Sequence, residues 1–283
     1  MAALAFALGS SLLWGIADFF GGLKSRSYPV PVVLAIMYSS SLTVMAVFIA
    51  VRGEGPPDAT ALFAALSAGL VGISALAAFY RALSIGTMSI VAPIASTGVA
   101  LPVIVGIAQG ERPGILRAAG IVAAVIGVVL ASREADGGAV GPREQRLSIV
   151  LALVAGFGFG SYFVGAEIAS REDVGWALLM SRVASTPIIV AIAIVALRRG
   201  GTRPGLRALG ALCLVGLCDL AANAAYNHAT TLGDLSVVSV GSSLYPVTTV
   251  MLAAVVLSER VRGVQRIGVV IAVTGVLLIA AGA

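Results

Sequence analysis

Apolar stretches of about 20 residues follow one another along almost the whole chain, separated by short polar segments. Each stretch is long enough to cross the roughly 30 Å hydrocarbon core of a bilayer as a helix. Charged residues make up only 11% of the chain, whereas soluble domains contain about 25%. The sequence therefore predicts an all-α membrane protein without a soluble domain that could carry out chemistry.

The apolar stretches predict ten transmembrane helices. The first begins at Ala3 without a basic leader, and no small-residue cleavage signature follows it, which favours a retained helix over a removed signal peptide. The predicted spans are 3–22, 30–51, 60–81, 87–108, 114–132, 147–168, 175–197, 206–227, 235–257 and 264–282.

The two halves of the chain resemble each other. Residues 80–89 match residues 226–236 with one inserted residue, and Gln109-Gly110-Glu111-Arg112 matches Leu257-Ser258-Glu259-Arg260. The repeat predicts two five-helix units, 1–132 and 147–283, joined by a polar loop at 133–146. Because five is an odd number, the second unit must cross the membrane in the opposite direction. Such inverted repeats enclose a central binding site near the midplane, where the two units meet.

These features resemble the EamA-type members of the drug/metabolite transporter superfamily over nearly the whole chain. The resemblance depends on the ten spans, on Trp14-Gly15 in the first span and on the Glu-Arg pairs at 111–112 and 259–260. It implies export of amino acids, related metabolites or drugs across a bacterial inner membrane. The first copy departs from the second at one position, where Ser39 stands in place of Arg182.

A polar stripe marks the eighth span. Asp219, Asn223 and Tyr226 stand at i, i+4 and i+7, on one face of a helix. A carboxylate in mid-span costs roughly 2.5–3.5 kcal/mol, so this face should meet protein or water and not lipid. The repeat places Ile73 and Ala77 at the positions of Asp219 and Asn223 in the third span. The fold alone therefore does not require polar groups there, which favours a substrate-facing role.

Arg182 is predicted to pair with Asp219. The two lie at similar depths on consecutive spans, about 10 and 12 Å from the same membrane side. An ion pair would lower the cost of burying either charge. Two roles stay open: a static pair that fixes helix packing, or a pair for which a zwitterionic substrate or a proton competes.

Further residues are candidates for substrate contact, ion coupling or hinge motion, although each can also be explained without a role in transport. Trp14, Tyr162 and Tyr245 are candidate substrate contacts, although interfacial anchoring explains many such aromatic residues. Possible coupling residues are Asp18, His228 and Glu167, all close to span ends, where a carboxylate or an imidazole can simply reach water. Pro102 and Pro246 lie near the middle of spans four and nine, where freed backbone is tolerated beside a cavity. We expect them to act as hinges, although such kinks are common in membrane helices.

Other functional classes lack their signatures. No glycine-rich loop followed by Lys-Ser/Thr is present, so ATP is not expected to drive the protein directly. One His and two Cys, Cys213 and Cys218, predict no metal site and no cofactor. The net charge of +5 suits anionic lipid head groups and requires no nucleic-acid partner.

The sequence thus predicts a secondary transporter that exports small amino acids or related metabolites by alternating access. Proton-coupled efflux of lipophilic cations is the alternative, and a membrane-embedded hydrolase is disfavoured because His228 has no nucleophile beside it. Thirteen Lys and Arg residues lie on one side of the predicted membrane and four on the other, which predicts that both termini are outside, opposite to what the resemblance implies. Monomer and homodimer both stay open.

Overall fold

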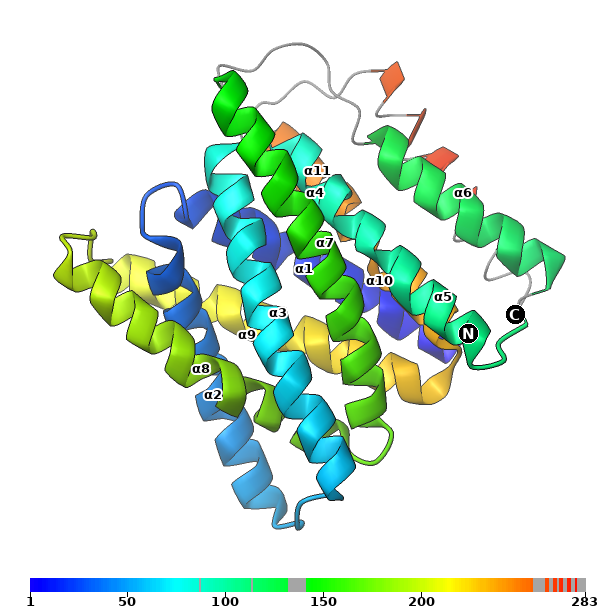
Figure 1. Cartoon of the computed structure of the whole chain (residues 1–283), viewed down its shortest axis with the longest axis horizontal. Coiled ribbons are helices and arrows are strands. Elements are labelled where there is room, and N and C mark those ends of the chain that lie inside the picture. The colour runs from blue at the N-terminus through cyan, green and yellow to red at the C-terminus, as the bar shows by residue number, and fades with distance from the viewer. Residues whose placement is uncertain are drawn as a thin grey trace.

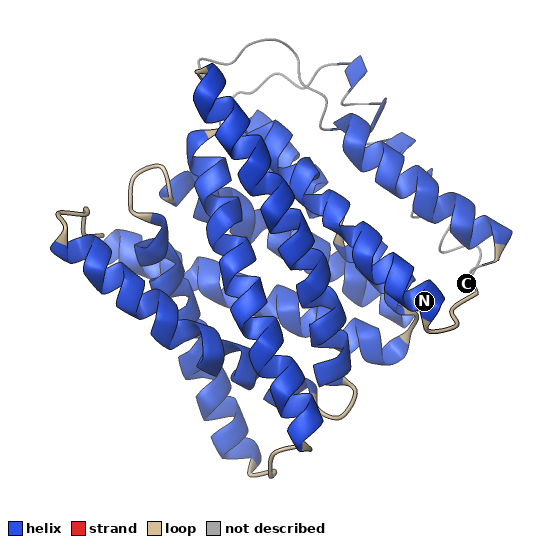
Figure 2. Ribbon diagram, viewed as in Figure 1, coloured by secondary structure: helices blue, strands red, loops and turns tan. Residues whose placement is uncertain are grey.

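The computed structural model describes residues 1–86, 88–112, 114–131 and 141–256, together with 263, 264, 267, 268, 270, 271, 274, 275 and 278. Among these residues all regular elements are helices and none is a strand (Figure 2). The predicted all-α class is therefore confirmed.

The helices follow the predicted spans closely (Figure 1). Their bounds are α1 Ala2–Lys24, α2 Val30–Arg52, α3 Ala59–Ile85, α4 Met88–Ser96, the 3₁₀ turn η1 Thr97–Val99, α5 Ala100–Ala108, α6 Ile115–Ala131, α7 Pro142–Ser170, α8 Val174–Arg198, α9 Leu206–Leu232, α10 Leu235–Ser242 and α11 Tyr245–Val256.

Seven helical segments in the described part of the chain are long and apolar enough to cross a membrane. One of them, Leu235–Val256, comprises α10 and α11 together. Two shorter apolar segments, Ile94–Ala108 and Ala118–Gly127, accompany them. Most of the predicted span 264–282 lies outside the described residues. The long helices extend beyond the predicted apolar limits, as α9 does to Leu232, because a helix can continue into the polar boundary where its side chains reach water.

Side-chain caps begin two of the helices that cross the membrane. Asp58 accepts a hydrogen bond from the Ala61 N–H at the start of α3, and Asp173 accepts one from the Trp176 N–H at the start of α8. Both satisfy donors that a first helical turn leaves unpaired. At the other end of α2, Gly53 takes the left-handed conformation (φ 70°) that terminates many helices.

Spans four and nine are interrupted helices. The first is divided into α4 and α5 by η1, and the second into α10 and α11 by a turn at Ser243 and Leu244. Pro102 and Pro246 lie in the first turn of α5 and of α11. Proline is tolerated there because the first-turn N–H groups have no partner within the helix. Both predicted hinge residues therefore lie beside a break in their helix.

The two halves pack on each other in a reciprocal pattern. Helix α3 of the first half lies against α7 of the second, α9 of the second half lies against α1 of the first, and α2 meets α8 (Figure 1). Two hydrogen bonds occupy equivalent positions within the two halves. Tyr80 Oη donates to the Ala17 carbonyl (3.2 Å) in the first half, and Tyr226 Oη donates to the Phe163 carbonyl (3.3 Å) in the second. Each tyrosine lies 63 residues after its acceptor. This equivalence supports the repeat in three dimensions.

Two glycines bring helices together at the centre of the molecule. A Cβ atom on Gly69 of α3 would overlap the backbone of Ser181 in α8, and one on Gly216 of α9 would overlap the backbone of Met37 in α2. Helix α6 lies at the edge (Figure 1), where Gly275 approaches the backbones of Gly120 and Ala124. Small residues allow this close helix packing without polar groups.

Candidate functional site

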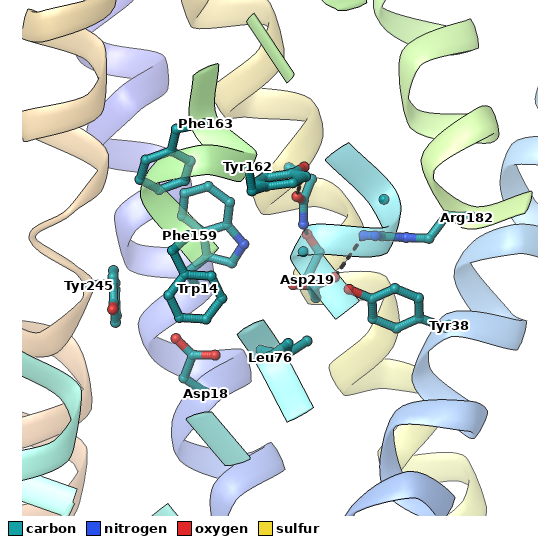
Figure 3. Close-up of a pocket in the computed structure, with 13 residues that line it drawn as sticks. Trp14, Asp18, Tyr38, Leu76, Phe159, Tyr162, Phe163, Arg182, Asp219 and Tyr245 are labelled. Atoms are coloured by element: carbon teal, nitrogen blue, oxygen red, sulfur yellow. Dashed lines mark hydrogen bonds and ion pairs between the residues drawn. The ribbon is translucent and has the colours of Figure 1, made fainter. Parts of the chain in front are cut away.

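A small cavity of about 50 Å³ lies in the centre of the helices (Figure 3). Helices of both halves form its wall, so it lies where the two copies meet. Its wall contains three charged side chains and a majority of aromatic or small residues. They are Trp14, Asp18, Tyr38, Gly69, Gly72, Leu76, Phe159, Tyr162, Phe163, Arg182, Asp219, Asn223 and Tyr245.

The ion pair predicted between spans seven and eight is present. Arg182 Nη2 of α8 donates to Asp219 Oδ2 of α9 at 2.8 Å, and the two residues are only 2% and 5% exposed (Figure 3). The Arg182 guanidinium carbon also lies 4.3 Å from the centre of the Tyr38 ring of α2. Burial of both charges is expensive, and their attraction and the aromatic face reduce that cost.

Arg182 keeps an unused donor. Among the described residues its Nε atom is buried without a hydrogen-bond partner. A buried charged donor left unpaired is unusual, because its desolvation is not offset. The guanidinium can therefore donate to a second anionic group beside Asp219.

Asn223 connects two helices at the cavity wall. Its Nδ2 donates to the Asp219 carbonyl one turn earlier in α9 (2.6 Å), while the Tyr162 hydroxyl of α7 donates to its Oδ1 (Figure 3). Both polar ends of the side chain are thus engaged. The Asp219 and Asn223 side chains face the cavity, as the helical spacing predicts.

Tyr226, the third residue of the stripe, does not line the cavity. It is fully buried and stacks on Phe163, with ring centres 4.6 Å apart. Its hydroxyl is engaged by the Phe163 carbonyl and by Ser239 Oγ (3.1 Å). Seven residues advance a helix by nearly two full turns and roughly 10 Å, so Tyr226 stays on the face of Asp219 but lies behind the cavity wall. There it contacts Trp14 of α1, Phe163 of α7 and Ser239 of α10. Its contacts are those of a packing residue.

Three further predicted residues do line the cavity. Trp14 of α1 stacks on Phe163, with ring centres 5.5 Å apart, and Tyr245 begins α11 with its ring edge-on to Phe79. Asp18, one turn after Trp14, is 6% exposed and points into the same space (Figure 3). The cavity wall therefore holds two carboxylates and one guanidinium among its described residues.

The other two predicted coupling residues lie elsewhere. His228 is exposed on α9, edge-to-face with Phe6 at 4.8 Å, and Glu167 pairs with Arg171 one turn later in α7 at 2.8 Å. Neither contributes to the cavity wall. Both lie near the end of a long helix, away from the central cavity.

Some wall residues were not predicted from the sequence. Tyr38, Leu76, Phe159 and Phe163 look like ordinary apolar material of a membrane span. Only Tyr38 carried a signal, since it directly precedes Ser39, the counterpart of Arg182 in the first copy. The described residues contain no group of three or more His, Cys, Asp or Glu side chains that could hold a metal ion.

Glu111 of the sequence motif has a structural role. Its carboxylate accepts hydrogen bonds from the N–H groups of Leu235 (2.7 Å) and Ser236 (3.2 Å) at the start of α10. A carboxylate from the first half thus caps a helix of the second half, where the helix dipole favours negative charge. Glu111 thus stabilises the start of α10, whereas Glu259 lies outside the described residues.

Comparison with known proteins agrees with this architecture. The model of the EamA-like transporter family matches residues 1–133 and 146–281. No curated protein matches the chain. Among 29 matching chains of solved structures, one crystal structure of a protein is 18% identical, covers 99% of this chain and 99% of its own, and has a TM-score of 0.75. At this identity the similarity establishes the fold alone.

Proposed function

The chain belongs to the EamA-like transporter family, and from that premise we propose that it exports small amino acids or related metabolites across a bacterial inner membrane. It is a multi-pass membrane protein that carries out secondary transport of small molecules, and it is not an enzyme. The proposal adds the substrate class, the direction of transport, the membrane and the mechanism of alternating access.

The observation that carries the proposal is the buried Arg182, which has one donor engaged by Asp219 and its Nε unpaired within the described structure. A substrate carboxylate would pair with that free donor. The substrate ammonium would then face Asp18 on the opposite part of the wall, where the rings of Trp14 and Tyr245 also attract a cation. A zwitterion supplies both charges at once, which satisfies every charged group of the cavity.

The size of the cavity supports a closed state within a transport cycle. One water needs about 10–15 Å³, so a space of about 50 Å³ holds a few waters and is too small for an amino acid. We propose that the ten predicted helices form two inverted five-helix units that rock about this point. The breaks beside Pro102 and Pro246 would supply the bending, and the distribution of Lys and Arg favours both termini outside.

Transport by purified protein in liposomes tests the proposal. An amino acid should be transported, and its decarboxylated amine should not, because the amine lacks the group that pairs with Arg182. Ser39→Ala, at the repeat-related position, serves as the control and should transport normally, whereas Arg182→Lys should lose most of the rate because Lys lacks the second planar donor. Failure to transport any of a broad panel of amino acids would overturn the proposal.

One observation favours the second candidate, proton-coupled efflux of lipophilic cations. Asp219 is neutralised by Arg182, whereas no ion pair to Asp18 is found among the described residues, so a cation or a proton could satisfy Asp18 alone. In the same liposomes, transport of the amine together with acid-driven accumulation would support this candidate. Asp18→Asn should abolish both under the cation mechanism.

A further inference from the structure

A second cavity opens on the side of the molecule, between α2, α8 and α9. It measures about 690 Å³, within the 300–1,000 Å³ that is usual for sites of small organic ligands. Its wall is apolar along its length and carries charges at one end. The wall consists of Val44, Met45, Phe48, Arg52, Glu172, Asp173, Val174, Gly175, Leu178, Leu217, Leu220, Ala221 and Ala224. We name this space the lateral groove.

The apolar part of the lateral groove faces outward. Val44 and Phe48 of α2 are 45% and 51% exposed, and Ala221 of α9 is exposed opposite them. In a membrane span, exposed apolar side chains lie toward the acyl chains. A molecule with an apolar body can therefore enter the groove directly from the lipid.

The charged end of the groove is acidic. Arg52 donates to Asp173 (Nη1 to Oδ1, 3.0 Å) and also pairs with Glu54, so two carboxylates share its single positive charge. Glu172 adds a third carboxylate, whose Oε2 accepts the Asp58 N–H at 3.0 Å. The excess of negative charge disfavours a phosphate and favours a cationic group at this end.

The groove and the central cavity lie back to back. In α9, Leu220 and Ala224 line the groove while the preceding residues, Asp219 and Asn223, line the cavity. A layer of buried side chains separates the two spaces, formed by Met45, Leu178 and Leu220. The groove is thus a distinct space with its own polar groups, and its occupancy does not require Arg182 or Asp18.

We propose that the lateral groove binds an amphiphilic cation, with its alkyl or aromatic body among Val44, Phe48 and Leu217 and its ammonium beside Glu172 and Asp173. This site goes beyond the transport proposal and does not depend on it. Binding can be measured on protein that transports nothing, so the two proposals fail independently.

Equilibrium binding of a fluorescent alkylamine, a dansyl-labelled chain with a terminal ammonium, tests the site on the full chain in lipid nanodiscs. The matched neutral probe ends in a hydroxyl group. Val44→Trp fills the groove, whereas Val47→Trp, three residues along α2 and 57% exposed, adds the same bulk outside the groove wall. We expect Val44→Trp to weaken amine binding by about tenfold and Val47→Trp to leave it unchanged.

A charge variant separates a cation site from a general lipid groove. Glu172→Gln should weaken binding of the amine by about threefold and leave the neutral probe unaffected. Glu144→Gln removes an exposed carboxylate at the start of α7, outside the groove wall, and should leave amine binding intact. Equal affinity for the amine and the neutral probe would identify the groove as an acyl-chain surface and overturn the proposal. Ala221→Leu is a smaller change that also fills the groove. Amine binding that survives both Val44→Trp and Ala221→Leu would overturn the proposal as well.

Discussion

Helices α3 and α9 are repeat-related, yet they differ in the residues that face the centre. Both carry a tyrosine that donates to a carbonyl in the first helix of its own half, Tyr80 of α3 to α1 and Tyr226 of α9 to α7. Helix α3 has Ile73 where α9 has Asp219, and the two side chains are equally buried, at 5% exposed. The tyrosine is therefore part of the scaffold that both halves share, whereas the carboxylate serves a function that is specific to α9.

The largest effect should come from breaking the buried pair in α9. Arg182→Met leaves Asp219 charged, buried and unpaired, which should lower the free energy of unfolding by about 3–5 kcal/mol. The double variant Arg182→Met/Asp219→Leu should recover most of this stability while transport stays abolished. Thermal unfolding in detergent measures the first effect, and flux into liposomes the second. If the Arg182→Met protein were as stable as the wild type, the ion pair would contribute nothing to the stability of the fold.

The converse change places a carboxylate in α3. Ile73→Asp should destabilise the protein by roughly 2.5–3.5 kcal/mol, because no described basic residue stands where Arg182 stands for α9 and Ser39 occupies the corresponding position. Ile73→Leu keeps the apolar character and should cost less than about 1.5 kcal/mol. The same unfolding assay compares the two. Equal stabilities would mean that α3 tolerates charge and that the contrast with α9 is unimportant.

The shared tyrosines should give smaller effects. Tyr80→Phe removes one hydrogen bond and should cost about 1 kcal/mol, since the Ala17 carbonyl keeps its helical bond. Tyr226→Phe also removes the bond to Ser239 Oγ and should cost somewhat more. The two sites share no hydrogen-bond partner, so the double variant should show the sum of the single effects. Thermal unfolding measures all three, and a Tyr226 variant that costs less than the Tyr80 variant would contradict this ranking.

The smallest effect concerns the start of α8. Asp173 caps α8 and binds Arg52, whereas the counterpart helix α2 begins at Val30, and its N-cap residue Pro29 provides no side-chain hydrogen bond. Partial burial tends to raise the pKa of Asp173, but hydrogen bonds from Arg52 and from the Trp176 N–H outweigh it and hold the pKa below its ordinary value.

A carboxylate with a lowered pKa stabilises the fold above the unfolded-state pKa of about 3.9, and that stability is lost as the pH falls below it. The difference in stability between wild type and Asp173→Asn should therefore be at most about 1 kcal/mol at pH 6 and should shrink toward pH 3. Thermal unfolding across this pH range measures it. A difference that does not change with pH would show that the cap does not depend on the charge.

Several parts of the fold followed from local pattern. The apolar stretches placed the described helices to within a few residues. The match of residues 80–89 to 226–236 put Tyr80 and Tyr226 at equivalent positions, where the structure gives them equivalent hydrogen bonds. The breaks in spans four and nine lie beside the prolines that the sequence singled out. These features depend on the length, spacing and type of neighbouring residues, all of which are visible in one dimension.

The candidate site was anticipated only in part. Asp219 and Asn223 were found because a polar stripe in an apolar helix is costly, and Arg182 because it lies at the same depth. Tyr226 shares their stripe but packs behind the wall, and Tyr38, which lies against Arg182, was not predicted although it directly precedes Ser39. The helical spacing gives the face on which a side chain lies, but it does not show how far along the helix axis the cavity extends, and that extent separates a wall residue from a packing residue.

The order of residues alone is enough to predict that this chain crosses a membrane repeatedly, in two related halves, and that a carboxylate and a guanidinium pair within the apolar interior. The cost of burying charge and the length of a helix are enough to decide this. Helix packing in three dimensions sets which side chains surround that pair, keeps His228 and Glu167 outside the cavity, and forms a separate lateral groove behind it. Those outcomes depend on how helices from the two halves cross. The crossing angles and positions are set by close contacts between residues far apart in the chain, such as Gly69 of α3 and Ser181 of α8.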